Sequence, residues 1–112
     1  MAITRTTIDS QGVTVAAAGT AVAPTRQLSE NTHTLIAYNS DTGEVWFNWS
    51  GGAGGALTKA DSVVVPAGGA ITLAPGARGV RAGFEDIESG LSFDASNNGA
   101  TVYITYLSGP TV

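Results

Sequence analysis

Few residues of this sequence are of the types that carry out chemistry, and they do not form a recognisable catalytic set. The 112 residues include one histidine, His33, and no cysteine. A nucleophile, base and orienter would therefore have to be built on His33 alone, and no G-x-S-x-G motif accompanies it. One histidine without cysteines also offers no usual zinc site, so we expect His33 at the surface or at the edge of the core. We predict no catalytic residues, no metal and no cofactor.

Acidic side chains are the second group of candidate ligands. Glu85, Asp86 and Glu88 lie close together, and Asp94 follows them. Calcium takes about six to eight oxygen ligands, and this spacing is not that of a calcium-binding EF-hand loop. A solvated acidic loop is the preferred interpretation, with structural calcium as the alternative. A pair of carboxylates converging in a cleft would support a small hydrolase, which is the third functional class considered.

The charge balance argues against several kinds of partner. Lys and Arg number 5 and Asp and Glu number 9, giving a net charge of -4, and only 12% of the residues are charged. An acidic chain lacks the basic stripe that nucleic acids or anionic membranes require, and no stretch approaches the ~20 apolar residues of a membrane span. The uncharged surface suits contact with neighbouring chains, because interface cores are depleted in charge. A merely Ser/Thr-rich surface without a partner is the alternative.

Short runs with a period of two residues, separated by glycine and proline, predict an all-β fold. We expect a single antiparallel β-sandwich, jelly-roll or immunoglobulin-like, of about eight short strands. Residues 1–11 are predicted to be an N-terminal arm or edge strand, and residues 12–112 the sandwich domain. The predicted strands span residues 2–8, 12–17, 32–38, 44–50, 62–65, 70–73, 79–84, 91–93 and 100–107.

The turn at residues 39–43 separates two such runs, so residues 32–50 are predicted to form a hairpin. Residues 51–60 are rich in Gly and Ala and predict a flexible loop. Alternation within the strands selects the core. The predicted core residues are Val13, Val15, Ile36, Tyr38, Val45, Phe47, Trp49, Val64, Leu73, Val102, Ile104 and Tyr106.

The same alternation points Trp46 away from the core, together with Asn48. An outward tryptophan indicates a protein interface, or a sugar-stacking platform in which Asn48 and Asp41 supply hydrogen bonds. The alternative is that another strand or loop of the same domain covers it. The predicted partner interface comprises Trp46, Asn48, Tyr103, Ile3 and Arg5.

Taken together, several segments resemble the small β-sandwich decoration or cement proteins of tailed-bacteriophage particles. The segments are residues 13–23, 34–39, 44–48, 60–62, 65–69, 73–76 and 102–107. The resemblance implies a structural virion protein, made in the bacterial host cytoplasm, that stabilises an assembled capsid through apolar and β-sheet contacts. It further implies a major capsid or portal/neck protein as partner and self-association, with a trimer favoured. A neck, head-fibre or spike component, or a carbohydrate-binding module using Trp46, are the alternatives.

Overall fold

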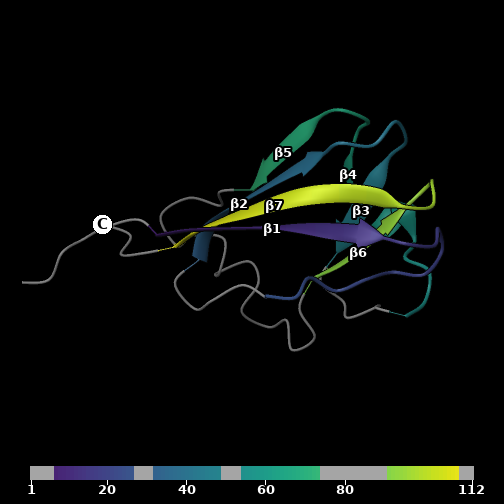
Figure 1. Cartoon of the computed structure of the whole chain (residues 1–112), viewed down its shortest axis with the longest axis horizontal. Coiled ribbons are helices and arrows are strands. Elements are labelled where there is room, and N and C mark those ends of the chain that lie inside the picture. Colours follow the sequence, from purple (N-terminus) through teal and green to yellow (C-terminus); the bar gives the residue numbers. More distant parts are fainter. Residues whose placement is uncertain (1–6, 27–31, 49–53, 74–90, 109–112) are drawn as a thin grey trace, which may run out of the picture.

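Alternating apolar residues in this chain build two antiparallel sheets that pack face to face. The computed structural model describes residues 7–26, 32–48, 54–73 and 91–108. The first sheet has the strand order β1-β7-β2-β5 and the second the order β4-β3-β6 (Figure 1). The strands are β1 (Thr7–Val15), β2 (Thr32–Asn39), β3 (Val45–Asn48), β4 (Val63–Val65), β5 (Ala70–Leu73), β6 (Ser92–Ala95) and β7 (Ala100–Ser108), with one 3-10 turn, η1 (Lys59–Asp61). The predicted all-β antiparallel sandwich is confirmed.

The strand order distinguishes between the two predicted topologies. In an immunoglobulin fold the last strand lies in the sheet opposite the first two strands. Here β7 lies between β1 and β2 in the same sheet. After β1, Val22 forms an isolated antiparallel bridge with Phe93 of β6. The arrangement fits a jelly roll in which the strand after β1 is reduced to this single bridge.

Two features of the N-terminal half differ from the predicted elements. One continuous strand, β1, spans Thr7–Val15 at the edge of its sheet and crosses the predicted boundary between residues 11 and 12. The predicted hairpin over residues 32–50 is wrong, because β2 and β3 lie in different sheets. The predicted strand at residues 79–84 lies outside the described residues, as do residues 2–6 of the strand predicted at 2–8.

A buried asparagine explains why β2 and β3 do not pair. Asn39 ends β2 and is fully buried. Its Nδ2 donates to the carbonyls of Gly43 (2.8 Å), Val65 (3.1 Å) and Pro66 (3.3 Å), while its Oδ1 accepts from the Asp41 N–H (2.9 Å). The Asn39 side chain thus bonds to two connections between the sheets, the one from β2 to β3 and the one from β4 to β5. A two-strand hairpin offers no such set of partners, so the turn after Asn39 becomes a crossing.

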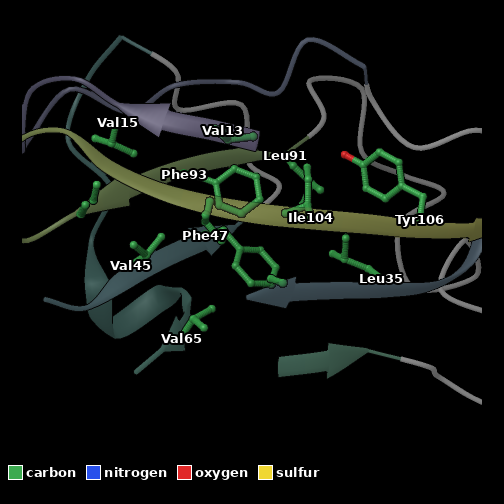
Figure 2. Close-up of a cluster of buried hydrophobic side chains, with 14 residues drawn as sticks. Val13, Val15, Leu35, Val45, Phe47, Val65, Leu91, Phe93, Ile104 and Tyr106 are labelled. Carbon is green, nitrogen blue, oxygen red and sulfur yellow. The ribbon is translucent and has the colours of Figure 1, made fainter. Parts of the chain in front are cut away.

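The core lies between the sheets, and Figure 2 shows its side chains pointing into that space. Seven of the predicted core residues are buried there. They are Val13, Val15, Val45, Phe47, Val102, Ile104 and Tyr106. The rings of Phe47 and Phe93 face each other across β3 and β6 of the three-stranded sheet, with their centroids 5.2 Å apart.

The predicted inward face of β2 requires correction. Leu35 and Ala37 are buried, whereas Ile36 is half-buried and Tyr38 is 44% exposed. The burial of Asn39 supplies the reason, since alternation along the strand sends Tyr38 to the opposite face.

Two other predicted core residues are only partly enclosed, and a third lies outside the described residues. Val64 is half-buried and its neighbour Val65 is the buried residue. Leu73 is partly buried and packs against the core. Trp49 is not among the described residues.

We expect Asn39→Ala to lower the free energy of unfolding by about 2–4 kcal/mol, because it leaves buried carbonyls without a donor. The measurement is urea denaturation followed by circular dichroism. Asn97→Ala is the matched control, since its exposed amide makes one bond to Asp41 and its loss should cost under about 1 kcal/mol. Equal losses in the two variants would contradict the role given to Asn39.

Candidate functional site

The outer face of the three-stranded sheet is closed by loops of the same chain. At its centre Asp94 is 1% exposed. Its Oδ1 accepts from the N–H groups of Gly19 (2.9 Å) and Ala95 (2.8 Å), and its Oδ2 accepts from the N–H of Leu57 (3.1 Å). A buried carboxylate needs such donors to offset its desolvation. Two separate loops are therefore held over this face.

Trp46 lies under one of these loops and is half-buried. Its Nε1 donates to the Leu57 carbonyl at 3.0 Å, and the Lys59 ammonium sits 5.5 Å from the ring centroid. Lys59 also forms an ion pair with Glu44. Of the readings proposed for Trp46, cover by a loop of the same domain is the one that the geometry supports.

The loop that covers Trp46 also differs from its predicted character. Within the predicted flexible loop at residues 51–60, the described residue Leu57 is buried and η1 follows it. Asn48, beside Trp46 on this face, donates from Nδ2 to the Ser62 hydroxyl at 3.2 Å. These contacts give the described part of the loop, residues 54–60, a fixed place against the sheet.

No metal-binding group is found among the described residues, which contain no cluster of three His, Cys, Asp or Glu side chains. Asp94 is engaged by main-chain donors, and Glu85, Asp86 and Glu88 lie outside the described residues. Within the same described ranges, no helix has the length and apolar character needed to cross a membrane.

The outer face of the four-stranded sheet is open and carries no charged side chain at any described position. We call it the open face. Its residues are Ile8, Ser10, Gly12, Thr14, Thr34, Ile36, Tyr38, Ala70, Thr72, Thr101, Tyr103, Thr105 and Leu107. Ile8 (68%), Tyr103 (53%) and Tyr38 (44%) are its exposed large apolar residues. The four strands lie side by side in Figure 1.

The two tyrosines lie directly opposite each other at the middle of the open face, Tyr38 on β2 and Tyr103 on β7. On the other side of Tyr103 the facing residue is Gly12 of β1. A Cβ at Gly12 would come within 3.3 Å of the Tyr103 ring, so that ring leans over the glycine. The missing side chain at position 12 lets the aromatic ring of Tyr103 lie over the glycine.

Hydroxyl groups on the open face are paired with one another across the strands. Ser10 and Thr105 are joined at 3.1 Å between oxygens, and Thr14 and Thr101 at 2.9 Å. Each of these hydroxyls already has a partner within the sheet. Covering them with an apolar surface therefore costs less free energy than covering hydroxyls bonded only to water.

The edge of the four-stranded sheet at β1 is occupied by Arg26. The guanidinium donates to the main-chain carbonyl of Ser10 (2.7 Å) and pairs with Asp9 at 3.0 Å. The Gln11 side chain forms two hydrogen bonds with the main chain of Arg26, donating from Nε2 to its carbonyl and accepting at Oε1 from its N–H. The Tyr106 hydroxyl also donates to the Arg26 carbonyl, at 3.1 Å. The hydrogen bond and charge of Asp9 raise the pKa of Arg26. Burial raises the pKa of Tyr106, so its hydroxyl remains a neutral donor.

The structure separates the residues of the predicted interface. Tyr103 lies on the open face, whereas Trp46 and Asn48 lie on the far side of the sandwich. Ile3 and Arg5 lie outside the described residues. The predicted interface lacks two exposed residues of the open face, Ile8 and Tyr38. For Tyr38, the signal that could have found it is the asparagine that follows it.

Comparison with known proteins yields one similar structure. No family model matches the sequence, and no curated protein matches it. The chain is similar to a solved structure described by the words "Bacillus endospore appendages form a novel family of disulfide-linked pili". The identity is 14%, the match covers 96% of this chain and 91% of the other, and the TM-score is 0.49. The 112 residues contain no cysteine with which to form disulfide links.

We expect Asp94→Asn to lower the free energy of unfolding by about 2–4 kcal/mol, because the amide nitrogen cannot accept from main-chain N–H groups. Hydrogen exchange should accelerate at Gly19 and Leu57 before it does in the core strands. Asp61→Asn, at an exposed position of η1, is the control and should change stability by under about 0.5 kcal/mol. Unchanged exchange at both loop positions would show that Asp94 does not hold the cover.

Ser92 gives a contrasting prediction. Its buried hydroxyl has no hydrogen-bond partner within the described residues. We expect Ser92→Ala to leave stability within about 0.5 kcal/mol of the parent or to raise it. Ser62→Ala removes a hydroxyl that bonds both Thr58 and Asn48 and should cost about 1 kcal/mol in the same denaturation experiment. A larger loss at position 92 than at position 62 would be the contrary result.

Proposed function

We propose that this protein is a non-catalytic structural subunit that joins a larger protein assembly through the open face. The observation that carries the proposal is an outer sheet face without charge at any described position, with Ile8, Tyr38 and Tyr103 exposed on it. Interface cores are enriched in tyrosine and depleted in charge, and both properties hold for the described positions of this face. The closed opposite face leaves this one for contact.

The resemblance to phage decoration proteins supplies the most specific form of the proposal. On this view the protein binds an assembled capsid and not its free subunits. Its binding then stabilises the shell by a free energy of RT ln(1 + [L]/Kd), where [L] is the free concentration of this protein and Kd is its dissociation constant. The low charged fraction of 12% agrees with such a role. A neck or fibre position on the same kind of particle requires the same open face.

Carbohydrate binding is the less favoured function. Sugar sites use a few convergent polar groups to fix orientation. The described open face has no amide or carboxylate side chain, and four of its hydroxyls are bonded to each other. The ring of Trp46, expected as the platform, is occupied by Leu57 and Lys59. Protein contact therefore has the stronger support.

The proposal is tested by size fractionation of the protein from the cells that make it. The parent protein should sediment on a sucrose gradient with a particle far larger than its own 11.3 kDa. Tyr103→Lys should move it to the top of the gradient, because a buried unpaired ammonium opposes the contact. Circular dichroism of the purified variant verifies that it is folded.

Ala60→Lys is the matched control, since it makes the same charge change at an exposed position of η1, near the closed face. It should remain with the particle. A parent protein found only as free chains, or equal release of both variants, would refute the proposed function.

A further inference from the structure

We infer that the occupant of the open face is the open face of a second copy, so that two chains pack sheet against sheet about a two-fold axis. The inference rests on the proposed function and names its partner. A pair of chains, rather than a single chain, would then be the unit that joins the assembly. Three properties of the described residues support it: the placement of charge, the pairing of hydroxyls and the area of the face.

Charge placement favours contact between copies on this side. Two chains of net charge -4 repel each other, and the repulsion is largest where like charges are close. The described charges lie elsewhere, with Asp9 and Arg26 at the β1 edge and Glu44 and Lys59 near the closed face. Judged by the charges that lie within the described residues, the open face is therefore where two identical chains approach with the least electrostatic repulsion.

The open face also suits a second copy of itself in polarity. A two-fold contact places the same surface on both partners, so that surface must be complementary to its own copy. The open face meets this condition in charge, because none of its described positions carries a charged side chain that would repel the same position of the partner. Sheets pack face to face about 10 Å apart when small and medium side chains interdigitate. The paired hydroxyls Ser10–Thr105 and Thr14–Thr101 need no new partner in such a layer.

The area of the face indicates whether it is large enough for a specific contact. The strands of this sheet have 9, 8, 4 and 9 residues. At about 4.8 Å between strands and about 3.3 Å per residue, the face covers about 500 Å². A pair therefore buries about 1,000 Å² in total, which is near the lower limit of specific interfaces. We expect a dimer that forms at micromolar concentrations and dissociates on dilution.

The first test measures association of the full chain by sedimentation equilibrium over a wide range of concentrations. The parent should be a monomer at low and a dimer at high concentration. Tyr103→Lys should raise the dissociation constant by about 10-fold to 100-fold, because it places two ammonium groups in the buried layer. Ala60→Lys carries the same charge change and should leave the constant within about 2-fold.

The second test fixes the geometry of the pair. The chain has no cysteine, so a single introduced thiol is unique. Ile36 lies centrally on the open face, between Thr105 of β7 and Thr72 of β5. Ile36→Cys should be joined into dimers in high yield by a short bismaleimide linker, and Ala60→Cys should not. Equal yields for the two positions would overturn the sheet-to-sheet arrangement.

The outcomes separate this inference from the proposed function. A parent that stays monomeric at all concentrations, yet loses its particle when Tyr103 becomes Lys, refutes the second copy and leaves the structural role. Dimers unaffected by Tyr103→Lys refute this face as the contact. Dimers that respond as expected, with no particle in the gradient, support the pairing and refute the structural role. Binding of the monomer to a glycan array, abolished by Tyr103→Ala, would assign the face to sugars instead.

Discussion

The carboxylate of Asp94 is held beneath three main-chain N–H groups, two of which belong to loops that lie outside the three-stranded sheet. A charged group in the middle of a sheet face must either remain in water or be given donors. In this protein the loops supply the donors, and in doing so they bury Leu57 and cover much of Trp46. Because of this interaction the outer face of the three-stranded sheet is covered, whereas the outer face of the four-stranded sheet is exposed.

The open face depends in turn on a polar group at the edge of the core. Asn39 ties together the two crossings between sheets, and its burial fixes which residues of β2 point inward. The neighbouring Tyr38 is thereby directed outward, opposite Tyr103. Two buried polar side chains, rather than the hydrophobic residues, thus decide how the surfaces of this small domain are used.

The sequence is informative about the fold class and about β3 and β7, whose strict alternation correctly places Phe47, Val102 and Ile104 inside. It is misleading for β2, because both of its faces carry apolar residues and alternation alone cannot choose between them. The choice is made by hydrogen bonds from Asn39 to residues 26 and 27 positions further along the chain. A local sequence pattern carries no information about hydrogen-bond partners so far along the chain. For the same reason the sequence predicts a hairpin at residues 32–50, where the chain passes from one sheet to the other.

The same limit applies to the candidate site. Trp46 attracts attention as a large ring pointing away from the core, but its cover comes from the Leu57 loop, whose composition suggests no structure. The open face has the opposite character, since its threonines and glycine are individually ordinary. Only the register of four strands shows that they form one uncharged surface.

The occupied edge at β1 has a consequence for growth. A sheet extends sideways when a new strand finds a free row of main-chain groups, which is how ribbons and amyloid begin. Arg26 takes the Ser10 carbonyl on this edge, Val22 bridges to β6, and β4 and β5 have only 3 and 4 residues. Addition of a further strand is therefore disfavoured at these described edges of the two sheets.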